Sequence, residues 1–272
     1  SSAASDVYKR QMCDSPMSVT KEKKDSSLGV ALRLLSEGKG DAMVSGGNTG
    51  AVLVGSTMYV KRIRGIRRAA LAPILPTDKG GALLIDCGAN VECTPEYLLQ
   101  FAYMGSFYCQ KQMKIASPRI GLINNGAEES KGTPMIKETY GLLKQAGEAG
   151  RLNFVGNIEG RDVPFGMADV ILCDGFTGNV LLKTYEGVGL YFVGELKKIF
   201  FKNLGTKLAA LLVKKGLGAL KKKMDYKEVG GAPLLGICKP VIKAHGSSDP
   251  RAFKSAIRQA VHYKALGVCY NH

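Results

Sequence analysis

Short strand-like apolar runs alternate with helix-like segments along most of this chain. The runs Ala82–Asp86, Arg119–Ile123 and Asp169–Cys173 have the length and composition of buried strands, and each precedes a segment with helical features. Strands that alternate with helices favour a mostly parallel sheet covered by helices on both faces. The sequence therefore predicts an α/β fold, with a three-layer α/β/α, Rossmann-like arrangement around a mostly parallel sheet.

Apolar spacing and helix-capping residues predict further helices and strands. The apolar residues between Leu28 and Leu35 have helical spacing, and Thr94–Pro95 and Asp249–Pro250 are typical helix starts, with a capping side chain followed by proline. Further strands are expected at 41–45, 153–155 and 241–244, and further helices at 51–59, at 133–145 and from about Asn179.

The length of 272 residues permits one large domain or two small ones. We expect residues 1–13 to be a disordered or foreign N-terminal segment. Residues 14–272 are expected to form a single α/β domain with a basic amphipathic helical hairpin at about 195–227. The net charge of +15 indicates an acidic partner, which could be nucleic acid, anionic lipid, or an acidic protein or substrate.

The cysteines argue against a metal site. There are seven, no two form a Cys-x-x-Cys pair, and the chain has only three histidines. Cys173 and Cys238 lie in apolar runs, which is typical of buried structural thiols in a reducing compartment. No stretch approaches the roughly 20 apolar residues needed to span a bilayer, and no signal-peptide pattern is seen. We expect a protein that is soluble or at most lies on a membrane.

Four turns rich in Gly and Asn follow predicted strands, where the carboxyl edge of the sheet should be. They are 45–50, 86–90, 124–126 and 174–179. Gly-rich turns let backbone amides approach a ligand, and a helix N-terminus favours an anion. One such turn is also common in ordinary βα connections, whereas four at one edge favour a site for an anionic ligand. None matches a nucleotide-binding glycine pattern.

Five motifs in the same order resemble the phosphate acyltransferase family. They are Ser45–Ala51, Leu84–Val91, Gly156–Asp162, Asp174–Asn179 with Leu182–Thr184, and Gly230–Leu234 together with Ile242–Ser248. The resemblance covers roughly residues 14–265. It implies an α/β/α fold related to phosphate acetyltransferases and isocitrate-type dehydrogenases. Family members begin with a strand and an Asp-Ala-Met-Gly-Gly-Asp turn that this sequence does not contain, so we expect a chain that lacks the front βα portion.

The resemblance also implies an activity and partners. The family transfers a long-chain fatty acyl group from acyl-ACP, the acyl-carrier protein thioester, to inorganic phosphate, without a metal or organic cofactor. The acyl-phosphate product enters phospholipid (phosphatidic acid) synthesis. The resemblance implies a cytoplasmic homodimer, peripherally associated with the inner face of the cell membrane, that delivers acyl-phosphate to a membrane acyl-phosphate:glycerol-3-phosphate acyltransferase. Nucleic acid is not an expected partner.

Three side chains are the catalytic candidates. Lys131 follows a sheet-edge turn and corresponds to a lysine of the family motif, so its ammonium could pair with phosphate or with the developing oxyanion. Asn179 is expected to open a helix, where capping and ligand binding are compatible. His245 could protonate the leaving thiolate or bind phosphate. The alternatives are a solvated lysine, a helix cap and a structural histidine.

A second set is expected to bind substrate. It consists of Asn48, Thr49, Gly50, Asp86, Asn90, Lys183 and Lys243, all from the recognised motifs. Glu159, Arg161 and Asp162 are expected to form an ion-pair network rather than to act in catalysis.

The segment 195–227 holds ten lysines among apolar residues at helical spacing. It could be a core helix pair with a solvated face, a dimer interface, a docking face for the acidic carrier, or an amphipathic hairpin on an anionic membrane. The residues expected to touch the membrane are Leu204, Leu208, Leu211, Leu212, Lys214 and Lys215.

Other functions compete with this interpretation. A short-chain phosphate acetyltransferase that uses coenzyme A would share the fold. A basic nucleic-acid-binding protein would explain the charge, but the lysines have no stacking aromatics among them. A third possibility is a non-catalytic fragment that binds only a membrane or a partner.

Overall fold

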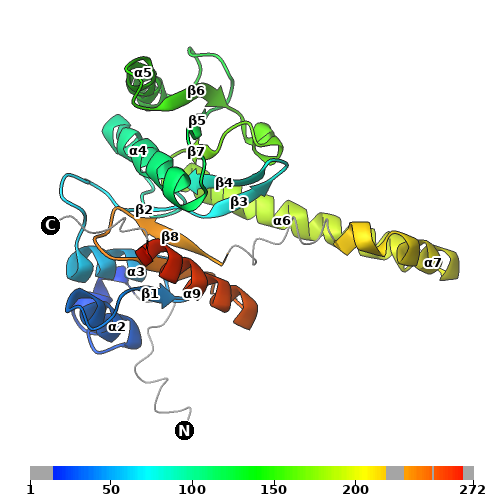
Figure 1. Cartoon of the computed structure of the whole chain (residues 1–272), viewed down its shortest axis with the longest axis horizontal. Helices are drawn as coiled ribbons and strands as arrows, with labels where there is room; N and C mark the ends of the chain where they lie inside the picture. The colour runs from blue at the N-terminus through cyan, green and yellow to red at the C-terminus, as the bar shows by residue number, and fades with distance from the viewer. Residues whose placement is uncertain (1–14, 219–229, 247, 266–272) are drawn as a thin grey trace, which may run out of the picture.

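The computed structural model describes residues 15–218, 230–246 and 248–265 (Figure 1). The helical elements are η1 (Pro16–Thr20), α2 (Ser27–Ser36), α3 (Thr49–Gly55), η2 (Ser56–Val60), α4 (Pro95–Gln112), α5 (Pro134–Glu148), η3 (Gly160–Phe165), α6 (Gly175–Phe200), α7 (Leu204–Leu212) and α9 (Pro250–Ala265). The strands are β1 (Met43–Ser45), β2 (Ala70–Leu71), β3 (Ile74–Thr77), β4 (Gly80–Ile85), β5 (Arg119–Ile123), β6 (Asn153–Ile158), β7 (Val170–Leu172), β8 (Gly231–Leu235) and β9 (Val241–Ala244).

The strands form two sheets. The larger has the order β3-β4-β7-β5-β6, in which β4, β7, β5 and β6 run parallel and β3 is antiparallel to β4. The smaller has the order β1-β9-β8-β2, with only β1 and β9 parallel. The predicted parallel, helix-covered sheet is therefore confirmed. The split into two sheets was not predicted from the sequence.

Both faces of the larger sheet are buried, because alternate residues of its strands point to opposite sides. Leu83 and Ile85 of β4 join the cluster beneath α4 and α5, whereas Leu84 joins the cluster packed against α6. The smaller sheet is covered by α9 on one face and by α2 and α3 on the other. Helices α4 and α9 meet through Tyr108 and Tyr263, whose ring centroids are 5.9 Å apart. Apolar burial on both faces explains the strand-like runs seen in the sequence.

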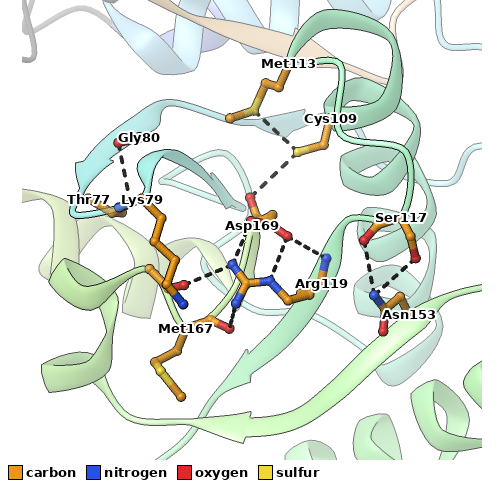
Figure 2. Close-up of polar contacts among 11 residues, drawn as sticks. Thr77, Lys79, Gly80, Cys109, Met113, Ser117, Arg119, Asn153, Met167 and Asp169 are labelled. Atoms are coloured by element: carbon orange, nitrogen blue, oxygen red, sulfur yellow. Dashed lines mark hydrogen bonds and ion pairs between the residues drawn. The ribbon is translucent and has the colours of Figure 1, made fainter.

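A polar cluster fastens the amino ends of β5 and β7 (Figure 2). Arg119 donates from Nε to Asp169 at 3.0 Å and from Nη2 to the other carboxylate oxygen at 2.9 Å. Its remaining N–H groups reach the carbonyls of Gly166 and Met167. Burial alone would raise the pKa of Asp169, but the hydrogen bonds and charge of Arg119 lower it overall. These contacts join β5 and β7 at their amino ends, which is the end of the sheet opposite to the loops that follow the strands.

The long helix α6 projects from the body, and α7 continues outward from it (Figure 1). None of the residues of α7 is buried, so the described part of 195–227 is not a core helix pair. Within that part α7 does not turn back along α6, and the remainder of the expected hairpin, with four of its lysines, lies outside the described residues. Across the described ranges, no helix is both long and apolar enough to cross a bilayer.

Most element predictions are confirmed. Thr94 caps α4 by accepting from the amide of Tyr97, and Asp249 accepts from the amide of Ala252 at the start of α9. Cys173 is buried as predicted, whereas Cys238 is only partly buried. The short strands β2 and β3 were not predicted: β2 has only two residues and pairs with the distant β8, and β3 forms a tight hairpin with β4. The expected segment 1–13 lies outside the described residues.

Candidate active site

A cavity of about 210 Å³ lies between the two sheets, beside the first turns of α6. One part of its wall is apolar and is formed by Leu71, Pro73, Ile74, Leu182 and Ala232. The polar part is formed by Thr49, Asn179, Lys183, Glu186, Lys243 and His245. A cavity with a cationic part and an apolar part fits a ligand that combines an anionic group with an apolar one.

Four charged or titratable side chains meet in the polar part. The ammonium of Lys183 lies 2.7 Å from a carboxylate oxygen of Glu186, one turn further along α6, and 3.4 Å from Nε2 of His245. Lys243 stands on β9, two residues before His245, and donates to the carbonyl of Ala244. One carboxylate thus faces two lysines and a histidine, and this balance favours an anion in the cavity.

Lys243 is the most buried of these cations, with 9% of its surface exposed. Burial lowers the pKa of Lys243 to about 8, and the neighbouring charge of Lys183 acts in the same direction. A bound anion would compensate both effects, because it supplies the opposite charge that the site lacks. The position of Lys243 is therefore costly for the free protein and well suited to an anionic ligand.

The loop 86–90 forms the wall of the cavity next to α6 and is organised by one carboxylate. Asp86 is fully buried, and its oxygens accept hydrogen bonds from the backbone amides of Leu71, Cys87, Ala89 and Asn90 and from the side-chain amide of Asn90. Burial raises the pKa of Asp86, while these N–H donors oppose the shift. Since Leu71 belongs to β2 and Asp86 follows β4, this carboxylate joins the two sheets next to the cavity.

Asp86 and Asn90 were predicted to bind substrate, and those roles stay predictions that the geometry of the cavity does not support. Neither side chain lines the cavity. Asn90 donates both to Asp86 and to the carbonyl of Ala69, so its amide is occupied in shaping the loop. Their neighbours Cys87 and Gly88 line the cavity instead.

Asn179 does not open a helix, and that prediction was wrong. Helix α6 begins at Gly175, and Asp174 is its N-cap, accepting from the amide of Thr177. Gly175 and Gly178 lie within the helix, and only glycine fits at either position, because a Cβ would lie 2.5 Å from the Asn90 carbonyl oxygen or 2.0 Å from that of Asp86. These glycines serve close packing rather than a turn. Asn179 lies in the second turn and faces the cavity beside Gly88.

The turn after β1 contributes less than expected. Asn48 caps α3 by accepting from the amide of Ala51 at 3.0 Å. Thr49 lines the cavity, whereas Asn48 and Gly50 do not. Gly50 instead packs close to Pro16, whose ring would lie 2.8 Å from an added Cβ.

Lys131 is exposed in the loop after β5 and is not part of the cavity wall. Its loop is fastened by Asn124, which donates to the carbonyl of Lys131, and by Asn157, which donates to that of Glu128. The turn 124–126 is thus separate from the cavity, although it follows a strand of the same sheet. A catalytic role of Lys131 stays a prediction that the geometry of the cavity does not support.

Sequence reasoning missed Glu186 and the apolar wall. Glu186 lies seven residues after Asn179 and three after Lys183, so the helical repeat puts all three on one face. That signal is present in the sequence, because the helix expected from about Asn179 already contains all three positions. The expected ion pair of Glu159 and Arg161 is confirmed at 3.0 Å, and Asp162 accepts from the backbone amide of Glu159.

Metal ligands are not grouped in this region. Over residues 15–218, 230–246 and 248–265, no cluster of three or more His, Cys, Asp or Glu side chains could hold a metal ion. The five cysteines in these ranges are free thiols.

The chain matches one family model over most of its length and has relatives with about half of their residues identical. Residues 3–271 match the family model described as "Fatty acid synthesis protein". The phosphate acyltransferase of Thermoanaerobacterium thermosaccharolyticum is 52% identical over 245 residues, which is 90% of this chain and 72% of that protein. The phosphate acyltransferase of Alkaliphilus oremlandii is 51% identical over 250 residues, covering 92% of this chain and 73% of that protein.

Solved structures support the fold. A phosphotransacetylase from Streptococcus pyogenes superposes with a TM-score of 0.59 at 19% identity, covering 87% of this chain and 66% of that one. A branched-chain phosphotransacylase from Enterococcus faecalis gives a TM-score of 0.54 at 17% identity, covering 88% and 79%. At these identities the likeness concerns the fold alone, and it confirms the predicted phosphotransacetylase-like architecture.

Proposed function

Because the chain belongs to the phosphate acyltransferase family, we propose that it transfers a long-chain fatty acyl group from acyl-ACP to inorganic phosphate in the cavity between its two sheets. The observation that carries this proposal is the convergence of Lys183, Lys243 and His245 beside an apolar wall. The acyl-phosphate product would serve phospholipid synthesis.

Phosphate binding is the first task of such a site. Lys243 and Lys183 supply two positive charges that can replace part of the water around the anion. Asn179 and Thr49 add an amide and a hydroxyl that can orient its oxygens. Glu186 holds Lys183 in place at 2.7 Å and limits the positive charge of the free cavity. The apolar wall is suited to the first part of the acyl chain.

The chemical step needs no enzyme nucleophile. An oxygen of monohydrogen phosphate attacks the thioester carbonyl, the new O–C bond forms and the C–S bond breaks. The leaving thiolate takes up the proton that the phosphate gives up, so the products are acyl-phosphate and a free thiol. The cations stabilise the oxyanion of the tetrahedral intermediate. Cys87 also lines the cavity, but burial, aided by the charge of Asp86, raises the pKa of its thiol to about 12. A thiol that stays protonated is a weak nucleophile, which favours direct attack by phosphate.

The choice of donor separates this proposal from its main competitor. Purified protein should release free thiol from a long-chain acyl-ACP only when phosphate is present, and acyl-phosphate should accumulate. Acetyl-CoA with phosphate should react much more slowly. A preference for acetyl-CoA would instead identify a short-chain phosphate acetyltransferase.

Phosphate use is expected to depend on pH through Lys243. Because its pKa lies near 8, below the ordinary value for lysine, the ammonium carries its charge below about pH 8 and loses it above. The kcat/KM for phosphate should therefore fall as pH rises through about 8, approaching roughly tenfold per pH unit. Lys243→Met should lack this fall. Steady-state kinetics at varied phosphate between pH 6.5 and 9.5 would measure kcat/KM for both proteins. If Lys243→Met showed the same fall as the wild type, the assignment of the fall to Lys243 would be wrong.

The extended helices support a peripheral membrane role within the same proposal. Leu204, Leu208, Leu211 and Leu212 are between 64% and 89% exposed on α7. Leucines beside lysines suit an anionic bilayer surface, where Lys214 and Lys215 would face lipid headgroups. A cytoplasmic homodimer that passes acyl-phosphate to a membrane acyl-phosphate:glycerol-3-phosphate acyltransferase is part of the proposal.

A further inference from the structure

The segment 61–68, between η2 and β2, concentrates positive charge on the surface. Five of its eight residues are exposed cations, and the segment has no acidic residue; the cations are Lys61, Arg62, Arg64, Arg67 and Arg68. Within the described part of the chain none of the five forms an ion pair with a carboxylate. Arg68 lies over the ring of Tyr97, at 5.6 Å from its centroid. We call this segment the basic rim.

The basic rim is held by its backbone, so its charges are not on a loose tail. The amide of Ile63 donates to Gly236, and the amide of Cys238 donates to Lys61, each at 3.0 Å. The side chain of Gln100 on α4 accepts from the amide of Arg67 and donates to the carbonyl of Gly65. Backbone anchoring fixes the positions from which the cations project without using their charged groups. Such preorganisation lowers the entropic cost of docking.

The basic rim continues directly into the wall of the cavity. Three residues after Arg68, Leu71 lines the cavity and donates its amide to Asp86. The carbonyl of Ala69 accepts from Asn90 in the loop beside the cavity. A partner bound on the basic rim would therefore lie close to the cavity wall that Leu71 helps to form.

We propose that the basic rim is the docking surface for an acidic protein that carries the acyl group as a thioester. This inference rests on the proposed function, which requires a carrier-borne donor. Complementary charge would steer the carrier toward the cavity and set its orientation.

The composition of the basic rim favours a protein over a bilayer or a nucleic acid. Its two isoleucines, Ile63 and Ile66, are partly buried, so it offers no exposed apolar side chain for insertion into lipid. The four leucines of α7, between 64% and 89% exposed, lie at the other side of the molecule from α3 and the chain that follows it (Figure 1). The basic rim also contains no aromatic side chain on which a base could stack.

The test neutralises three cations of the basic rim together, as Arg62→Gln, Arg64→Gln and Arg67→Gln. The backbone contacts of the segment do not use these side chains. The control makes the same charge change on the extended helices, as Lys197→Gln, Lys202→Gln and Lys207→Gln, all exposed. Each protein is assayed with phosphate and two donors, a long-chain acyl-ACP and the same acyl group on a small carrier-free thiol such as N-acetylcysteamine.

The basic-rim variant should lose roughly tenfold or more in kcat/KM for the carrier-borne donor, mainly through KM, with a weaker dependence on salt. Its rate with the small thioester should match that of the wild type, and the control should match with both donors. Equal loss with both donors, or loss in the control, would overturn the docking inference. Unchanged kinetics of the basic-rim variant with acyl-ACP would also overturn the docking inference. Loss of binding to anionic vesicles or RNA in that variant would not rescue it. Failure of the wild type to use acyl-ACP would instead overturn the proposed function, and the docking inference with it.

Discussion

Lys243→Met should reduce the phosphate-dependent rate of acyl transfer by roughly 100-fold, the scale of losing one charged group that stabilises a developing oxyanion. The loss should appear in KM for phosphate as well as in kcat, because the ammonium contacts the anion before and during attack. Steady-state kinetics at varied phosphate and saturating donor would measure both. The side chain lies on β9 at the cavity, so methionine keeps most of its volume and removes only the charge.

Stability should move in the opposite direction, and this separates a binding role from a structural one. Lys243 has a folded-state pKa near 8, below its ordinary value, because of burial and then the charge of Lys183. Protonated Lys243 therefore costs folding free energy below about pH 8, and methionine removes that cost. We expect Lys243→Met to melt no lower than the wild type at pH 7. Lys254→Met, at an exposed position on α9, is the control and should leave rate and melting temperature unchanged. A large drop in melting temperature for Lys243→Met would contradict the binding role.

Gly178→Ala is expected to destabilise the protein by at least about 2 kcal/mol, although alanine is the better helix former. An added Cβ would lie 2.0 Å from the carbonyl oxygen of Asp86 and 2.9 Å from the sulfur of Cys173. Relief requires either α6 or the loop 86–90 to move, and both form walls of the cavity. Acyl transfer should therefore fall together with stability, as measured by urea unfolding and by the thiol-release rate.

Gly187→Ala on the same helix is the matched control. No atom lies within 4 Å of an added Cβ there, so the substitution should stabilise the helix by about 0.5–1 kcal/mol. If Gly178→Ala were as stable as Gly187→Ala, the close packing of α6 on the loop 86–90 would be wrong.

The sequence was sufficient to predict the elements that depend on local signals. Thr94 and Asp249 cap helices where expected, and the buried strands follow from their apolar runs. Asn179 was misplaced because Gly175 and Gly178 resemble a turn until the loop that packs against them is known. The need for glycine at both positions comes from contacts with the loop 86–90, far earlier in the sequence.

The sequence could predict a residue of the cavity only where a residue of a recognised motif also points into the cavity. Five of the candidate residues line it, namely Thr49, Asn179, Lys183, Lys243 and His245. Asp86 comes from an equally strong motif but is used to join the two sheets. A motif gives residue types and order, whereas the direction of a side chain depends on sheet pairing and helix packing between distant segments.

The claim that the cavity, and not the loop after β5, carries the chemistry is tested most directly by one comparison. Phosphate-dependent thiol release from long-chain acyl-ACP should be measured for the wild type, Lys183→Met and Lys131→Met. We predict a loss of roughly 100-fold for Lys183→Met and a rate close to that of the wild type for Lys131→Met. The reverse order, with Lys131→Met inactive and Lys183→Met active, would contradict the assignment of the active site to this cavity.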